Sequence, residues 1–181
     1  MSPGHLFAVA GPSGAGKDTL MAAARRRRPD LVIVRRVITR PSGATGEPHE
    51  GVSEAEFARR RAAGDFALWW EAHGLRYGIP ATIRDDLGAG RTVLFNASRR
   101  ILATAGRQFP GLVVLHVSAP DALRAERLAA RGRESAAEIG ARLDRSDLTM
   151  PDGVPVRRIV NDGGVEDGAE RLLAALQPAR A

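Results

Sequence analysis

The sequence contains GPSGAGK at residues 11–17, a stretch that fits the pattern G-x-x-x-x-G-K of phosphate-binding loops. Glycines at such positions let consecutive backbone N–H groups turn toward one point, because glycine has no Cβ atom to clash. These donors, together with the N-terminus of a following helix, favour anionic oxygen atoms. An apolar run at residues 5–10 precedes the loop and a helical pattern at residues 16–27 follows it. Strand, loop and helix together predict the binding of a nucleoside triphosphate.

Lys17 is expected to reach the β- and γ-phosphates and to offset charge that develops during phosphoryl transfer. The next position usually carries a Ser or Thr whose hydroxyl meets Mg²⁺, but here Asp18 stands there and Thr19 follows. We predict Asp18 near the metal, directly or through water, while Thr19 either supplies a hydroxyl or caps the turn. ATP and Mg²⁺ are the expected cofactors. The residues assigned to the nucleotide in this segment are Gly11, Pro12, Ser13, Gly14, Ala15, Gly16, Lys17, Asp18 and Thr19.

Apolar runs alternate with helical patterns along the whole chain, which predicts an α/β fold with a parallel sheet flanked by helices. No linker or repeat divides the sequence, so we expect one domain over residues 1–181. The runs predicted as strands are 5–10, 31–34, 66–70, 92–95, 112–117 and 157–160. The predicted helices are 16–27, 53–63, 80–87, 98–107, 121–131, 136–145 and 165–176.

Residues 36–78 break this alternation and are typical of an insertion on the α/β core. The polar stretch 39–52 has no periodicity and is a candidate binding loop. Ser53 followed by Glu56 fits a capping box that opens a helix. Gly74 and Gly78 are expected to bracket a turn around Tyr77, with Pro80 in the first turn of the next helix.

Composition narrows the function classes. The chain has no Cys, which excludes disulfides and zinc–thiolate sites, and none of its apolar runs approaches the roughly 20 residues of a spanning helix. We predict no signal peptide and a cytoplasmic location. The net charge is +6, with 27 Lys+Arg against 21 Asp+Glu, nearly all of the basic residues being Arg. This excess indicates either a compositional bias or a site for polyanionic ligands, and nucleic acid is not expected, because no basic tract is interleaved with aromatic residues.

Beyond the loop, the chain resembles the guanylate kinase family over nearly its whole length. The shared motifs are GPSGAGK at 11–17, ITRP at 38–41, GE at 46–47, VSEAEF at 52–57, YG at 77–78, RLAARGR at 127–133 and VND at 160–162. The resemblance implies a guanylate kinase-like P-loop fold, with a core at about residues 1–35 and 79–181. It also implies an acceptor-binding lobe at about 36–78 and an Arg-rich lid over ATP at about 131–147.

The positions that read guanine in that family are not matched. An acidic residue and a Ser there correspond to Leu68 and Ile79 here, and an Asp-x-Asp pair corresponds to Asn96-Ala97-Ser98. A purine edge facing apolar side chains would leave polar groups unpaired, at about 1–3 kcal/mol each. GMP is therefore expected to be a poor substrate.

These departures resemble one group within the family, the ribose 1,5-bisphosphate phosphokinases. The matching segments are GKD at 16–18, VITRP at 37–41, GEPH at 46–49, AHGLRYGIP at 72–80 and NASR at 96–99, where that group usually has Asn-Gly-Ser-Arg. The resemblance implies that ATP and α-D-ribose 1,5-bisphosphate give ADP and 5-phosphoribosyl 1-diphosphate (PRPP), in phosphonate catabolism. An acceptor with two phosphates and no base suits a lobe rich in Arg and His.

Several residues of the lobe are candidates for binding the acceptor. Arg40 is expected to grip a phosphate, and Arg36 either does the same or is solvated. His49 either donates to phosphate or is a surface histidine, and the Tyr77 hydroxyl either donates to phosphate or the ring only packs. Glu47 is expected to position Mg²⁺-bound water or to hold an arginine of the lobe, and His73 either contacts the ribose or packs. The remaining candidates on the acceptor side are Leu68, Ile79, Asn96, Ser98 and Arg99. Trp69 and Trp70 are expected to form core and lobe wall.

The lid and the adenine pocket complete the predicted site. Arg131 and Arg142 are the expected catalytic arginines beside Lys17, because guanidinium groups stabilise the charge on the equatorial oxygens in the transition state. Arg133 is a third lid candidate, and Asn161 and Asp162 are expected, by family resemblance, to line the adenine pocket.

Two other functions fit the sequence less well. A guanylate or other nucleoside-monophosphate kinase is disfavoured by Leu68 and Ile79. A non-catalytic guanylate kinase-like interaction module is disfavoured because Lys17, Arg131 and Arg133 are all present. The expected partners are small molecules only, and the chain is expected to be a monomer or a homodimer.

Overall fold

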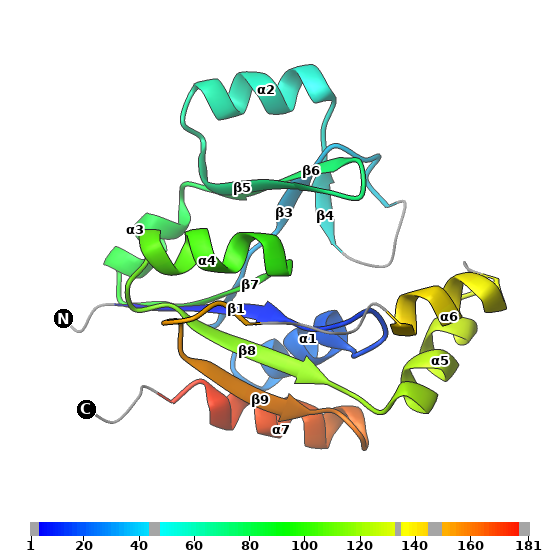
Figure 1. The fold of residues 1–181 in the computed structure, drawn as a ribbon. Coiled ribbons are helices and arrows are strands. Elements are labelled where there is room, and N and C mark those ends of the chain that lie inside the picture. The colour runs from blue at the N-terminus through cyan, green and yellow to red at the C-terminus, as the bar shows by residue number, and fades with distance from the viewer. Residues whose placement is uncertain (1–3, 44–47, 133–134, 145–149, 178–181) are drawn as a thin grey trace.

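The computed structural model of the chain describes residues 4–43, 48–132, 135–144 and 150–177 (Figure 1). Its main sheet has five strands in the order β2-β7-β1-β8-β9, and every neighbouring pair is parallel. The strands are β1 (His5–Ala10), β2 (Val32–Ile33), β7 (Thr92–Asn96), β8 (Val113–Ser118) and β9 (Val156–Val160). The parallel α/β fold predicted from the alternating pattern is confirmed.

Helices cover both faces of this sheet because the side chains of β1 alternate between two apolar cores. Phe7 and Val9 pack in one core with residues of α1 (Lys17–Arg27) and α7 (Val165–Ala175). Leu6 and Ala8 pack in the other, with residues of α3 (Ile83–Gly88) and α4 (Arg99–Gln108). Figure 1 shows α1 and α7 on one side of the sheet and α4 on the other.

A second sheet of four strands, in the order β4-β3-β6-β5, lies above α4 (Figure 1). Strands β3 and β4 run parallel, whereas the β3–β6 and β5–β6 pairs are antiparallel. The strands are β3 (Arg36–Ile38), β4 (His49–Gly51), β5 (Phe66–Ala72) and β6 (Leu75–Pro80). The stretch expected to be an aperiodic loop therefore contains β4, a strand too short to show a period.

Helix α2 (Glu54–Ala62) follows β4 and starts where the sequence predicted. The Ser53 Oγ atom accepts a hydrogen bond from the Glu56 backbone N–H, with an N···O distance of 3.1 Å. The reciprocal half of a capping box is replaced, because the Glu56 carboxylate accepts hydrogen bonds from Arg59 and Arg60 instead. These two guanidinium groups lower the pKa of Glu56 to about 2.

The turn predicted around Tyr77 was placed wrongly. Tyr77 lies inside β6, opposite Trp70 of β5, and the chain reverses at His73 and Gly74, where φ is +53° and +73°. Two central residues with positive φ are typical of a tight hairpin turn. Gly78 serves packing instead: a Cβ atom there would lie 2.6 Å from the Phe66 ring.

Two helices stand at the end of the molecule near the loop that follows β1 (Figure 1). They are α5 (Asp121–Ala130) and α6 (Ala136–Asp144). Pro80 ends β6 and does not open a helix, since α3 starts at Ile83. Within the described residues, the chain forms no helix that is both long and apolar enough to cross a membrane.

Candidate active site

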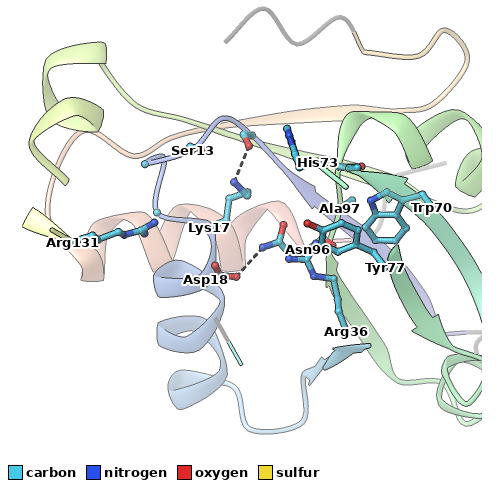
Figure 2. A pocket seen from close by; sticks show the side chains of 15 residues that line it. Ser13, Lys17, Asp18, Arg36, Trp70, His73, Tyr77, Asn96, Ala97 and Arg131 are labelled. Atoms are coloured by element: carbon cyan, nitrogen blue, oxygen red, sulfur yellow. Dashed lines mark hydrogen bonds between the residues drawn. The ribbon is translucent and has the colours of Figure 1, made fainter. Parts of the chain in front are cut away.

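A cavity of about 260 Å³ opens where the loop after β1 faces the second sheet (Figure 2). The carboxyl ends of β1 and β7 lie at this edge of the main sheet, which is where ligands bind in open α/β folds. Its lining is Gly11, Ser13, Gly14, Gly16, Lys17, Asp18, Arg36, Trp70, Ala72, His73, Tyr77, Asn96, Ala97, Ser98 and Arg131. The structure therefore brings the predicted phosphate loop and part of the predicted acceptor lobe to one cavity.

The phosphate loop has the backbone geometry that its glycines permit. Gly14 and Gly16 have φ of +79° and +90°, a region that residues with a Cβ atom rarely adopt. A Cβ atom at Gly16 would also lie 2.5 Å from the Asn161 Nδ2 atom. The Lys17 Nζ atom donates hydrogen bonds to the carbonyl oxygens of Gly11 and Pro12, at 2.8 and 3.2 Å, so the ammonium group lies within the loop.

Arg124 of α5 supports this loop from behind. Its side chain is 2% exposed, its Nε atom donates to the Ser13 carbonyl oxygen at 3.0 Å, and its Nη1 atom pairs with Asp121 at 2.8 Å. A guanidinium group on the buried side of α5 fixes the direction of the Ser13 carbonyl. Arg124 was not predicted from the sequence; the signal for it is an arginine one turn before Leu128, on the buried face of the helix.

Arg127 and Asn161 hold the next two carbonyl groups of the loop. The Arg127 Nη1 atom donates to the Gly14 and Ala15 oxygens at 3.3 and 3.4 Å. The Asn161 Nδ2 atom donates to the Ala15 oxygen at 2.7 Å, and Arg127 also reaches the Asn161 carbonyl. These donors fix the directions of the Gly14 and Ala15 carbonyl groups of the loop. Arg127 was likewise not assigned from the sequence.

A chain of polar contacts joins the loop to the second sheet (Figure 2). The Asn96 Nδ2 atom donates to Asp18 Oδ1 at 2.9 Å, and Arg36 Nη1 donates to the Asn96 carbonyl oxygen at 3.2 Å. The Arg36 guanidinium is 5.2 Å from the centre of the Tyr77 ring, which stacks on Trp70 with centroids 5.3 Å apart. Arg36 is only 7% exposed, so the acceptor side of the cavity carries a largely desolvated cation.

Other predicted acceptor residues take different places. His49 is 2% exposed, and its Nε2 atom lies 3.1 Å from the Pro41 carbonyl oxygen, which ties β4 to the segment after β3. Arg40 is half-buried nearby and, like His49, does not belong to the described cavity lining. His73 does line the cavity, from the tip of the β5–β6 hairpin. Arg99 starts α4, next to the cavity residue Ser98.

Leu68 and Ile79 face each other across the β5–β6 ladder and belong to the apolar core. They are 2% and 0% exposed. Leu68 shares a face of β5 with Trp70 and Ala72, which reach the cavity, but it lies further from the hairpin tip. The two apolar positions therefore form the floor beneath the acceptor side and do not line it.

The predicted lid and adenine residues are only partly described. Arg131 is exposed and lines the cavity from the end of α5. Asp162 is exposed and paired with Arg171 at 2.7 Å, a contact that lowers the pKa of Asp162. Thr19 is exposed and faces a separate hollow beside α1. Glu47, Arg133 and the side chain of Arg142 lie outside the described residues.

The charges around the cavity suit an anion with its metal. Lys17, Arg36 and Arg131 are cationic, and Asp18 is the acidic side chain of the described lining. Burial, together with the charges of Arg158 and Lys17, lowers the pKa of His116 on β8. Mg²⁺ needs few protein ligands when phosphates and water complete its octahedron, so one carboxylate oriented by Asn96 fits it. No group of three His, Asp or Glu that suits a metal occurs among the described residues.

The fold and this site together have the architecture of guanylate kinase-like P-loop proteins. The structure is similar to guanylate kinase from Anaplasma phagocytophilum, with a TM-score of 0.66 and 21% identity over 97% of this chain and 85% of that one. It is also similar to a gluconokinase from Sinorhizobium meliloti, with a TM-score of 0.54 and 19% identity over 96% and 91% of the two chains. At this identity the likeness shows the fold.

Curated relatives show the family. The ribose 1,5-bisphosphate phosphokinase PhnN of Pseudofrankia inefficax is 48% identical over 97% of this chain and 92% of its own length. That of Acidiphilium cryptum is 58% identical over 79% and 77% of the two chains. The chain belongs to the ribose 1,5-bisphosphate phosphokinase family, which confirms the resemblance found in the sequence. No family model matches the chain.

Some relatives are longer. The bifunctional ribose 1,5-bisphosphokinase-thymidine phosphorylase of Cupriavidus necator is 46% identical over 96% of this chain. The chain spans 29% of the length of that relative, and thus corresponds to only one part of it.

Proposed function

We propose that the chain transfers the γ-phosphoryl group of ATP to the 1-phosphate of α-D-ribose 1,5-bisphosphate, giving ADP and 5-phosphoribosyl 1-diphosphate. The observation that carries the proposal is the acceptor side of the cavity. It presents the desolvated Arg36 guanidinium and Tyr77 above an apolar floor of Leu68 and Ile79. Such a wall favours a phosphate. Leu68 and Ile79, which stand at the guanine-reading positions of the resembled family, are buried in the core and supply no polar partner to a purine.

On the donor side, the loop N–H groups and Lys17 would hold the triphosphate, and Arg131 would approach it from α5. Asp18 would hold Mg²⁺ together with phosphate oxygens and water. A bound Mg²⁺ neutralises charge on the β- and γ-phosphates. We further propose that residues 36–78 act as the acceptor lobe and residues 131–147 as the lid, with Arg133 and Arg142 adding to Arg131.

The reaction needs alignment more than proton transfer. An oxygen of the acceptor 1-phosphate, ionised at neutral pH, attacks the γ-phosphorus of ATP. The bond from that phosphorus to the β–γ bridging oxygen breaks, and ADP leaves with its electron pair. No proton has to be removed from the nucleophile, so positioning and charge neutralisation would supply most of the rate. Because no general base is needed, the proposed reaction does not depend on His73, the histidine among the described lining residues.

Phosphorus NMR tests the proposal. ATP, Mg²⁺ and ribose 1,5-bisphosphate are incubated with the protein, and a new pair of diphosphate doublets distinct from ADP is expected. Lys17→Ala should lower the rate by about 100-fold or more, because one preorganised charge is lost at the transferred group. A protein that forms ADP without the sugar diphosphate, or that does not turn over at all, would refute the proposal.

A further inference from the structure

The start of helix α4 lies at the acceptor side of the cavity. Ser98 is its N-cap residue and lines the cavity, but its side chain makes no capping hydrogen bond. The Ser98 Oγ atom is buried and has no hydrogen-bond partner within the described part of the chain. Ser53, at the start of α2, shows the usual arrangement, with its Oγ accepting from the N–H three residues on. A hydroxyl that does not cap its own helix is left for another acceptor or donor.

The charges in the first turn of α4 are reversed from the usual preference. The positive end of the helix dipole favours acidic side chains nearby. Helix α4 has none in its first turn and begins with Arg99 and Arg100. A bound anion at this helix N-terminus would be favoured by the positive end of the dipole. The ten-residue length of α4 gives that dipole several turns.

Trp70 supplies an independent observation on the same cavity. Its side chain is 5% exposed, stacks on Tyr77 and lines the cavity. Its Nε1 atom is buried and has no hydrogen-bond partner among the residues described. Figure 2 shows the nitrogen-bearing edge of the indole turned toward Ala97. A buried indole N–H usually finds an acceptor, so this donor points to a ligand at the start of α4.

We propose that Ser98, the first N–H groups of α4 and the Trp70 Nε1–H form a subsite for the phosphate of the acceptor that does not react, the 5-phosphate. This inference rests on the proposed function for the identity of the acceptor. The transfer point is marked by Asp18, which Asn96 contacts at 2.9 Å. Ser98 lies two residues beyond Asn96, at most about 7 Å of extended chain. A pentose with a phosphate at each end spans a separation of this order.

The proposed subsite gives the stacked Trp70 and Tyr77 rings a role in holding the acceptor. Trp70 is held by Tyr77, which is itself covered by the Arg36 guanidinium. The reacting phosphate would contact Arg36, and the second phosphate would contact the indole N–H behind the stack. The Ser98 Oγ atom is covered in this structure, and a change of the Ser98 χ1 rotamer, a move between staggered wells, would turn it toward the ligand.

Indole NMR tests this subsite without relying on turnover. The chain has two tryptophans, so ¹⁵N labelling gives two Nε1–H signals, which the Trp69→Phe variant assigns. Trp69 is 39% exposed, packs against Arg61 and lies on the other face of β5. Titration with ribose 5-phosphate should shift the Trp70 signal downfield to saturation and leave the Trp69 signal in place. Equal shifts in both signals, or none in either, would overturn the subsite.

Kinetics with two acceptors give the second test. Ser98→Ala and Trp70→Phe should each raise KM for ribose 1,5-bisphosphate by about tenfold or more, the loss of a hydrogen bond to a charged group. The KM for ribose 1-phosphate, which has no 5-phosphate, and the KM for ATP should stay unchanged. Trp69→Phe serves as the matched control. A parallel rise for both acceptors would mean that the two residues only support the lobe and would overturn the proposal.

The two proposals fail in different ways. A wild-type protein that makes no sugar diphosphate refutes the proposed function, yet the indole titration still decides whether the subsite binds a sugar phosphate. Ser98→Ala removes one oxygen atom, so it remains informative should Trp70→Phe lower the melting temperature.

Discussion

Asn96, the last residue of β7, donates a hydrogen bond from Nδ2 to Oδ1 of Asp18 on the first turn of α1, at 2.9 Å. On the proposed role of Asp18 as the Mg²⁺ ligand, this contact would orient the carboxylate that stands where phosphate loops usually have a hydroxyl. A carboxylate that is free to rotate would hold a metal poorly, whereas the Asn96 amide fixes one oxygen and leaves the other for the cavity. The Asn96 carbonyl in turn accepts from Arg36, so Asn96 joins the phosphate loop to the second sheet.

Asn96→Ala should therefore raise the Mg²⁺ concentration needed for half-maximal rate by about tenfold or more, because loss of an orienting partner typically costs 10–100-fold in metal affinity or activity. A Mg²⁺ titration at saturating ATP measures it. Thr92→Val, at the other end of the same strand, is the matched control. An unchanged Mg²⁺ requirement in Asn96→Ala would show that Asp18 does not depend on this hydrogen bond.

Gly16→Ala should lower the affinity for ATP and reduce stability by about 1–3 kcal/mol. Position 16 has φ of +90°, and an added Cβ would lie 2.5 Å from Asn161 Nδ2. Either the loop has to move or the Asn161 side chain does, and a shift of either would disturb the hydrogen bond from Asn161 to the Ala15 carbonyl oxygen. Titration calorimetry with ATP and urea unfolding measure the two effects. Gly111→Ala, where a Cβ atom meets nothing within 4 Å, should change neither; wild-type ATP affinity in Gly16→Ala would count against the loop assignment.

Arg124→Leu separates a positioning role from a structural one. The partner carboxylate of Asp121 is 72% exposed, so removing the Arg124 guanidinium leaves no buried unpaired charge, and we expect a small loss of stability. The Ser13 carbonyl would lose its donor at 3.0 Å, so KM for ATP is expected to rise by about tenfold. Steady-state kinetics and thermal melts on the same samples test this. Should the melting temperature fall while KM stays constant, Arg124 would be a purely structural residue.

His116 gives a pH dependence of stability. Burial and the charges of Arg158 and Lys17 lower its pKa in the folded protein below the ordinary value of 6.5. Below pH 6.5 the unfolded chain therefore binds more protons than the folded protein does. The contribution of neutral His116 to the free energy of unfolding is thus present above pH 6.5 and is lost as the pH falls below that value. Urea unfolding at pH 7.5 and 5.5 should show a smaller loss in His116→Gln than in the wild type. An equal loss in both proteins would assign the pH effect to other groups.

Much of the fold could be predicted because local signals agreed with it. The apolar run of β1, the loop glycines and the Ser53 cap each specify a local conformation that tertiary packing keeps. The turn around Tyr77 could not be placed, because Gly74 and Gly78 give the same local signal. Only the structure shows that Gly74 turns the chain while Gly78 makes room for the Phe66 ring.

The part of the site formed by consecutive residues could be predicted from the sequence. The part formed by residues from distant segments of the chain could not. Residues 11–18 follow one another, so their spacing indicated their chemistry. Arg124 and Arg127 lie more than a hundred residues further along, and nothing in the loop indicates which helix supports it. Leu68 shows a second limit of the sequence. The resemblance predicts that Leu68 faces the acceptor, but the position of each residue along β5 places Trp70 at the cavity and Leu68 in the core.

The acceptor that the cavity selects is the central question about this protein. The most direct measurement is the ratio of kcat/KM for ribose 1,5-bisphosphate to that for GMP, with ATP and Mg²⁺ held constant on one preparation. Two unpaired polar groups on a bound guanine, at about 1–3 kcal/mol each, predict a ratio of at least about 30 in favour of the sugar bisphosphate. A ratio below one, with GMP turned over faster, would contradict the account.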